Sequence, residues 1–230
     1  MKTIGLLGGM SWESTGHYYR LLNEGIKAAR GGLHSAPIAM VSVDFDPLAR
    51  WMQEDDWDAV SRHLCQSAKQ VEAAGADFLM LGSNTMHKVA DNIAAAIDIP
   101  LLHLIDATAE AIKAQGLSSV GLLGTRTTMD DPFYTDRLTT HGLTVHVPMS
   151  TAQDRLNRII FEELCLGRFT DPSRRELLYI MAELEQAGAE CIVEGCTEIG
   201  MLVEPSHTGQ PLFDTTRIHA QAAVRLALDD

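Results

Sequence analysis

The chain has few of the groups that would suit it to nucleic acid or to a membrane. Its 230 residues hold 18 Lys and Arg against 31 Asp and Glu, a formal net charge of -13. Because no basic cluster offsets phosphate repulsion, we expect no nucleic-acid partner. No run approaches the roughly 20 apolar residues of a membrane span, so we expect no membrane partner. Low-complexity stretches are also absent, and the hydrophobic content of 46% is enough for a large buried core.

Cysteine is scarce and does not cluster. The four cysteines are Cys65, Cys165, Cys191 and Cys196. None belongs to a CxxC pair, and none lies near two histidines at ligand spacing. We therefore expect neither a zinc site nor a disulfide framework.

The start of the chain lacks a full dinucleotide-binding pattern. Gly8-Gly9-Met10 is a tight glycine turn after the first apolar run, without the complete GxGxxG spacing. Close approach of the backbone to a small ligand is a sufficient explanation, which makes Met10 a candidate binding residue. The first residues, MKTIGLLGGMSW, read as a buried strand and not as a signal peptide, and we expect a cytoplasmic protein.

What the sequence does contain is a segment that occurs twice. Residues 75–85 read GADFLMLGSNT, and residues 188–198 read GAECIVEGCTE. The IGLLG of residues 4–8 recurs as VGLLG at 120–124. Such self-similarity predicts two related half-domains about a pseudo-twofold axis. In this alignment Ser83 corresponds to Cys196, and we expect the two to face each other across one cleft.

Short apolar runs alternate with helical patterns along the chain, which is typical of parallel βαβ units. Strands are expected at Thr3–Leu7, Ile38–Val43, Phe78–Leu81, Leu101–Leu104, Val120–Leu123, Leu143–His146 and Cys191–Glu194. Helices are expected at Trp57–Ala73, Ala107–Gln115, Pro132–Thr140, Ala152–Leu166, Ser173–Gln186 and Asp214–Leu228.

These elements predict an α/β fold with two pseudosymmetric, doubly wound parallel-sheet lobes and an active site in the cleft between them. The first lobe comprises residues 1–98 plus 212–230, and the second comprises 99–211. Ligands of such sheets bind outside the carboxyl ends of the strands. All four loops of the repeat follow strands and lie at that edge.

Cys196 is the strongest catalytic candidate. It follows a strand and precedes an expected helix start, where backbone N–H groups and the helix dipole lower a thiol pKa toward the thiolate. A thiolate is both a general base and a nucleophile. The alternative is a small buried hydrophobe, as most free cysteines are. Because Cys196 lies in the repeated loop, the sequence favours function, whereas the other three cysteines are assigned to packing.

The partner loop offers hydroxyl and amide groups. Ser83, Asn84 and Thr85 follow Gly82, and their donors suit a carboxylate. A capped helix start is the structural alternative, since these residues are favoured there. His87 follows one turn later, facing either the cleft or solvent.

Two further loops hold candidate binding residues. Thr125 and Thr128 occupy the corresponding position in the second half and add hydroxyl donors. Arg50 is expected on a loop that reaches the cleft, where its guanidinium would fork onto a second carboxylate of a substrate. A surface arginine in a polar loop is the alternative.

Several segments together resemble the aspartate/glutamate racemase family, the cofactor-independent amino-acid racemases. They are KTIGLLGGMSWEST, SNTMHKVAD, LLGTRTTM, IIFEELCLG, EGCTEIG and FDT, which span nearly the whole chain. The resemblance implies a two-lobed homodimer that takes a small amino-acid substrate and needs neither metal nor pyridoxal phosphate. Two cysteines would flank the substrate α-carbon, one removing a proton and the other returning one.

Carried over by motif, the second of these cysteines is Cys196. The resemblance assigns the substrate α-carboxylate to Asn84, Thr85, Thr125, Thr128 and Thr197. It matches Arg50 to a basic residue that reads the side-chain carboxylate. Glu198 would orient the ammonium group or tune the thiol, and a favourable acid in a first helical turn is the alternative.

The sequence departs from the family at two positions. Ser83 stands where the first cysteine is expected, and a hydroxyl is a far weaker acid than a thiol. Cys165 stands where aspartate-specific relatives carry a lysine for the distal carboxylate. The resemblance implies that the second cysteine acts on the L-enantiomer, so we hypothesise that Cys196 deprotonates the L-enantiomer, while Ser83 or a water that it holds reprotonates the other face.

Two alternatives stay open. An arylmalonate-type decarboxylase or isomerase would need only the single thiol of Cys196, because one protonation of a carbanion completes that reaction. A non-catalytic protein that binds a small dicarboxylate is the other, although a cysteine in the GCTE loop favours catalysis.

Overall fold

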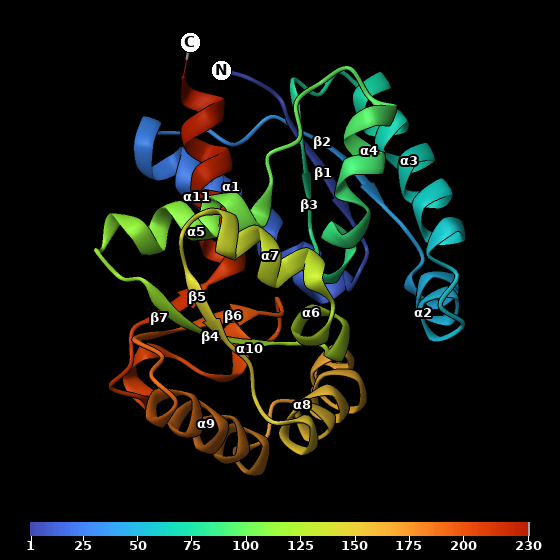
Figure 1. Ribbon diagram of the computed structural model, residues 1–230. Coiled ribbons are helices and arrows are strands. Elements are labelled where there is room, and N and C mark those ends of the chain that lie inside the picture. The colour runs from blue at the N-terminus through green and yellow to red at the C-terminus, as the bar shows by residue number, and fades with distance from the viewer. Residues whose placement is uncertain (230) are drawn as a thin grey trace. The chain divides into compact units, whose positions relative to one another are not determined.

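The computed structural model describes residues 1–229, which form two compact units. The first unit comprises residues 1–104 together with the chain from His219 onward, and the second comprises residues 105–218. These units end a few residues later along the chain than the lobes expected from sequence. Each unit contains a parallel β-sheet flanked by helices (Figure 1). Among residues 1–229, no helix is both long and apolar enough to cross a membrane.

The first unit has a three-stranded sheet of order β2-β1-β3, in which all pairs are parallel. Its strands are β1 (Ile4–Gly8), β2 (Ile38–Ser42) and β3 (Phe78–Leu81). Its helices are α1 (Trp12–Arg30), α2 (Phe45–Gln53), α3 (Trp57–Ala73), the 3-10 helix η1 (Thr85–Val89) and α4 (Ala90–Ala96). Most of α11 (Thr215–Leu228) also belongs to this unit.

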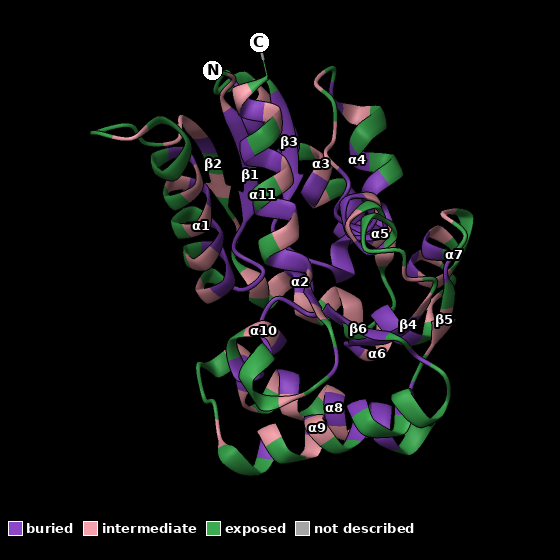
Figure 2. Cartoon of the chain, turned by 90° about the vertical axis from the view of Figure 1, so that its left-hand side faces the viewer, coloured by how far each residue is buried: buried purple, intermediate pink, exposed green. Residues whose placement is uncertain are grey.

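The apolar run of β3 is continuous because both faces of this sheet are covered. Phe78 and Met80 pack into a cluster with residues of α1 and α11. Leu79 and Leu81 point the other way, into a cluster with residues of α3 and α4. Figure 2 shows β1 and β3 as buried between these helices. Successive side chains of β3 point to opposite faces of the sheet, so this one strand contributes to two apolar clusters.

The second unit has a four-stranded parallel sheet of order β5-β4-β6-β7. Its strands are β4 (Ser119–Gly124), β5 (Thr144–His146), β6 (Cys191–Gly195) and β7 (Leu212–Asp214). Its α-helices are α5 (Leu104–Ala114), which begins at the last residue of the first unit, α6 (Arg126–Asp130), α7 (Pro132–Thr140), α8 (Ser150–Glu162), α9 (Asp171–Gln186) and α10 (Ile199–Leu202). Two 3-10 helices, η2 (Leu164–Leu166) and η3 (Pro205–His207), lie between them.

Helix α9 shows how the sequence sets these elements. The Thr170 side chain accepts a hydrogen bond from the backbone N–H of Ser173 and caps the first turn. Leu177, Met181 and Leu184 recur at helical spacing and are buried in the core of the second unit.

The α/β fold with two parallel sheets is confirmed. The repeated segments become neighbouring strands in each unit, because β1 pairs with β3 and β4 pairs with β6. One expected strand, Leu101–Leu104, is wrong. Leu101 makes only an isolated bridge to Leu79, and Leu104 already begins α5. Strand β7 and helices α1, α2, α4 and α6 were not among the expected elements, whereas α10 provides the helix start expected after Cys196.

Candidate active site

In the first unit, the expected site loops follow β1 and β3, whose carboxyl ends are adjacent. Leu7 is in register with Leu81, and the backbone N–H of Gly82 donates to the Leu7 carbonyl at 2.8 Å. Ser83 is therefore held directly beside the end of β1, and the residue is only 6% exposed. Asn84 and Thr85 follow it and are also buried.

The glycine turn after β1 is tight because the chain passes close to its neighbour. Gly9 has φ of +94°, and a Cβ there would lie 2.2 Å from the Val43 carbonyl oxygen. Its backbone N–H donates to the Thr15 hydroxyl at 2.7 Å, which ties the turn to helix α1. Met10 follows and is buried in the apolar cluster beneath α3.

The sequence predicts that Arg50 lies on a loop, and this prediction is wrong. Arg50 belongs to α2, which Asp44 caps by accepting from the backbone N–H of Asp46 at 3.2 Å. Its guanidinium forms an ion pair with Asp46 one turn earlier, 3.2 Å away, and its side chain is 65% exposed. The Asp-Phe-Asp-Pro stretch therefore starts a helix, and an exposed pair of this kind contributes little stability.

In the second unit, the two site loops follow β4 and β6 at one sheet edge. Gly124 and Gly195 are in register, and a Cβ on Gly124 would lie 2.8 Å from the Gly195 carbonyl oxygen. The two glycines thus allow the strand ends to approach closely. Thr125 directly follows β4 and Cys196 directly follows β6, so the two residues lie on adjacent loops.

Thr125 and Thr128 form one hydroxyl pair on the first of these loops. Their Oγ1 atoms are 3.1 Å apart, and the Thr125 hydroxyl also accepts from the backbone N–H of Thr128. Both side chains are buried. Arg126, the first residue of α6, lies between these two threonines in the sequence.

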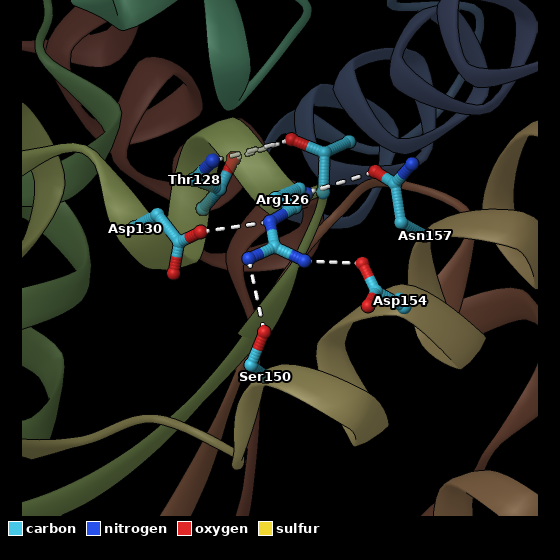
Figure 3. A network of polar contacts seen from close by, with 7 residues as sticks. Arg126, Thr128, Asp130, Ser150, Asp154 and Asn157 are labelled. Carbon is cyan, nitrogen blue, oxygen red and sulfur yellow. Dashed lines mark hydrogen bonds and ion pairs between the residues drawn. The ribbon is translucent and has the colours of Figure 1, made fainter.

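Arg126 anchors this loop to α8 (Figure 3). Its guanidinium contacts Asp154 and Ser150 of α8 and also Asp130, to which its Nε donates at 2.9 Å. Its backbone N–H donates to Asn157 Oδ1 at 2.9 Å. These contacts tie the start of α6 to α8.

Cys196 lies in a buried loop whose charge is negative. Its Sγ donates to Glu198 Oε2 at 3.1 Å, and the Thr197 hydroxyl donates to the same oxygen at 2.6 Å. Burial, the charge of Glu198 and the nearby Cys165 raise the pKa of the Cys196 thiol well above its ordinary value. The expectation of a lowered pKa is therefore wrong. Only the single turn of α10 follows, and its dipole does not offset burial and the carboxylate.

Cys165, which the sequence assigned to packing, lies in η2 and packs against the apolar cluster that contains Cys196. The Cys165 thiol is apolar in character and, unlike the lysine that the resemblance leads one to expect at this position, carries no positive charge. Among the described residues, no group of three or more His, Cys, Asp or Glu is arranged to hold a metal ion.

Sequence reasoning assigned no role to Glu194, which the structure places in the middle of the unit. The residue is 2% exposed. Burial and the charge of Asp214 raise the pKa of this carboxyl group to about 8, against a smaller opposing effect of Arg217. The signal for it was present: one acid ends the apolar run Cys-Ile-Val-Glu-Gly of β6.

Comparison with known proteins places this chain among amino-acid racemases. The model of the Asp/Glu/Hydantoin racemase family matches residues 7–223. A solved structure of a candidate Asp/Glu racemase from Yersinia pestis is 49% identical, with full coverage of both chains and a TM-score of 0.92. An aspartate racemase homologue from Pyrococcus horikoshii is 33% identical, with full coverage of both and a TM-score of 0.84.

A curated relative extends the comparison to a characterised activity class. The broad-specificity amino-acid racemase RacX of Bacillus subtilis is 22% identical over 96% of each chain. The family model covers all the loops described above and every strand except the first residues of β1, and both solved structures cover the full chain. This chain belongs to the Asp/Glu/Hydantoin racemase family.

Proposed function

We propose that this protein is a pyridoxal-phosphate-independent amino-acid racemase that inverts the α-carbon by proton transfer. Cys196 is the base toward the L-enantiomer, and Ser83 or a water that it holds acts on the other face. The observation that carries the proposal is the Cys196 thiol, hydrogen-bonded to Glu198 at 3.1 Å at the carboxyl end of β6. Membership of a racemase family supports it.

The first step removes the proton from the thiol. The ammonium group of the substrate, bound beside Glu198, offsets the charge of this carboxylate, which also accepts from the Thr197 hydroxyl, and the thiol releases its proton to solvent. The resulting thiolate takes the α-proton of the L-substrate as a new S–H bond, and the electron pair stays on the α-carbon, delocalised into the α-carboxylate. Ser83 or its water then gives a proton to the opposite face and recovers one from solvent.

Substrate binding uses the donors at the two sheet edges. The proposed contacts of the α-carboxylate are Asn84, Thr85, Thr125, Thr128 and Thr197, with Met10 as an apolar neighbour. Glu198 would hold the ammonium group, since it supplies negative charge beside the thiol. Arg50 would read a side-chain carboxylate, which requires that the substrate displace Asp46 from it. Aspartate, glutamate and neutral amino acids are the substrates to compare.

The test is α-proton exchange in deuterated buffer, followed by NMR together with circular dichroism. Enantiomers have equal free energy, so kcat/KM must be the same in both directions. A difference between the two faces therefore has to be measured as the rate of α-proton exchange relative to the rate of inversion. With a thiol on one face and a hydroxyl on the other, we expect L-substrate to exchange faster than it inverts. Persistent exchange in Cys196→Ala would refute the proposal.

A decarboxylase of the arylmalonate type is the second candidate, favoured by Ser83 in the loop where the resemblance calls for a second cysteine. That reaction needs a single protonation, which one thiol supplies. Release of carbon dioxide from an arylmalonate, with no exchange of any amino acid, would select it. A cleft that binds a dicarboxylate without either reaction would leave binding as the function.

We further propose that the protein acts as a homodimer in the cytoplasm. Sedimentation velocity tests the dimer directly, since a single species of the monomer mass would exclude it. The independence from pyridoxal phosphate is tested by activity of protein that shows no cofactor absorbance and does not respond to added pyridoxal phosphate.

A further inference from the structure

Three histidines meet in the first unit, behind the loop that carries Ser83. The ring of His87 lies 4.6 Å from that of His103 and 6.1 Å from that of His219, between centroids. All three are buried. They do not form a ligand set, because no such group in the described chain is arranged to hold a metal ion. Another reason is needed for placing three titratable rings in one core.

Both nitrogens of His87 are hydrogen-bonded to the backbone. Nδ1 lies 2.7 Å from the Ser83 carbonyl oxygen. Nε2 accepts from the backbone N–H of Leu104 at 3.2 Å. The ring thereby links the Ser83 loop to the first residue of α5, which is also the last residue of the first unit.

These partners determine the tautomer of the ring. The Leu104 amide can only donate, so Nε2 must carry a lone pair. The Ser83 carbonyl can only accept, so Nδ1 must carry the proton. His87 is therefore neutral in the Nδ1–H form, since an imidazolium would direct an N–H group at the Leu104 amide.

The neighbouring His219 is fixed in the same manner. Its Nε2 donates to the Leu102 carbonyl oxygen at 2.9 Å, and its Nδ1 accepts from the Tyr18 hydroxyl at 3.2 Å. Two neutral rings thus hold residues 102–104 by their backbone groups. The anchor to which His87 ties Ser83 is itself well fixed.

We propose that His87 is a positioning residue for the reaction: as a neutral Nδ1–H ring, it fixes the Ser83 carbonyl and with it the direction of the Ser83 Cα–Cβ bond, from which the hydroxyl extends. This role rests on the proposed racemase function, in which Ser83 serves the second face. A carbonyl bond fixes the backbone dihedral of Ser83 and hence its Cα–Cβ direction. A displacement of about 1 Å in a reacting group costs on the order of a hundredfold in rate.

Two substitutions separate the two hydrogen bonds of the ring. His87→Asn places an amide N–H near the position of Nδ1, so it retains the donor to Ser83 and loses the contact with Leu104. His87→Gln places its amide near the position of Nε2, so it retains an acceptor for Leu104 and loses the donor to Ser83. Tyr18→Phe is the control, because it alters the same core without touching either bond.

The readout is the number of inversions per α-proton exchange of the L-substrate in deuterated buffer. In His87→Gln we expect this ratio to fall about tenfold or more, while exchange at the Cys196 face continues. In His87→Asn and Tyr18→Phe we expect it to stay near the wild-type value. Nitrogen-15 NMR of labelled histidine should show the Nδ1–H tautomer, assigned by its loss in the variants.

Three results would overturn the role of His87: an Nε2–H or doubly protonated ring, an unchanged ratio in His87→Gln, or an equal loss in His87→Asn. A wild-type protein that exchanges without inversion would overturn it as well, because Ser83 would then deliver no proton. Absence of any exchange in the wild type would instead refute the racemase function itself. The two failures are thus distinguishable.

Discussion

Replacing Glu194 by Gln should remove a large part of the pH dependence of folding stability. The residue is 2% exposed, and its Oε1 has no hydrogen-bond partner among the described residues. Its other oxygen faces Gly200, where a Cβ would lie 3.4 Å from it and 3.0 Å from Asp214 Oδ2. A charged pair in this space is unfavourable, so the folded protein keeps Glu194 protonated.

The magnitude follows from the two pKa values. The carboxyl group titrates at 4.5 in its ordinary state and at about 8 in the folded protein, because of burial and Asp214. Each pKa unit corresponds to about 1.4 kcal/mol, which gives about 3–5 kcal/mol over this window. The folded state binds a proton that the unfolded chain releases. The stabilisation is therefore complete below pH 4.5 and is lost as the pH rises toward 8.

Urea unfolding followed by circular dichroism at pH 5, 6.5 and 8 checks this. We expect Glu194→Gln to lose most of the wild-type decline in the free energy of unfolding across these conditions. Equal differences between the variant and the wild type at all three pH values would refute the reasoning, since Glu194 would then titrate as in an unfolded chain.

Glu190, one residue before β6, is the matched control of opposite sign. Hydrogen bonds from the backbone N–H groups of Ser118 and Ser119 lower its pKa. Its contribution is present above its ordinary pKa of 4.5 and is lost as the pH falls below it. Glu190→Gln should therefore leave the decline between pH 5 and 8 in place.

Three further outcomes are expected. Cys196→Ser should slow α-proton exchange of L-substrate by about a hundredfold or more, measured by NMR, because a hydroxyl replaces the thiol base. Gly9→Ala should lower the free energy of unfolding by about 2–4 kcal/mol in urea titrations, since φ of +94° and a Cβ 2.2 Å from the Val43 carbonyl oxygen are both unfavourable. Burial lowers the pKa of His219 from 6.5 to about 3, so its neutral form stabilises the fold above pH 6.5 and that contribution is lost as the pH falls toward 3. His219→Gln should reduce this acid sensitivity in thermal unfolding scans from pH 7 to 4.

The repeat in the sequence carried most of what could be predicted about the fold. The repeat predicted two related half-domains, and in each of them the two repeated strands pair in parallel, β1 with β3 and β4 with β6. The pattern failed at Leu101–Leu104, which is apolar and follows a proline. There the Leu104 amide bonds to a histidine instead of a strand, a tertiary contact that no local pattern reveals.

The two helices near the N-terminus that the sequence analysis did not predict both begin after a capping residue. Ser11 caps α1 by accepting from the backbone N–H of Ser14, and Asp44 caps α2 in the same way from Asp46. Both caps are residue types that favour helix starts. Because α2 was missed, Arg50 was expected on a loop, whereas it lies on an exposed face of that helix.

The candidate site residues stay a prediction, whereas the structure corrects the ionisation that the sequence suggested for Cys196. A cysteine before a short helix suggested a low pKa, whereas burial and the contact with Glu198 raise it. Whether a carboxylate or a helix end dominates depends on distances of a few ångströms, and sequence spacing does not give these. Glu194 was overlooked for the same reason, because its effect comes from Asp214, which follows only after a further helix and turn.

Burial and the charge of Glu198 raise the pKa of the Cys196 thiol, and the proposed substrate would offset the second of these causes. The ammonium group of an amino acid, bound beside Glu198, would offset the negative charge that now holds the proton on Cys196. The pKa of the thiol should therefore be lower in the complex than in the free enzyme. Since kcat/KM reports groups of the free enzyme and kcat those of the complex, the rising limb should lie at lower pH in kcat. Glu198→Gln should bring the two limbs together, because the charge that separates them is gone. Limbs that coincide in the wild-type enzyme would show that the substrate does not lower the pKa of the thiol.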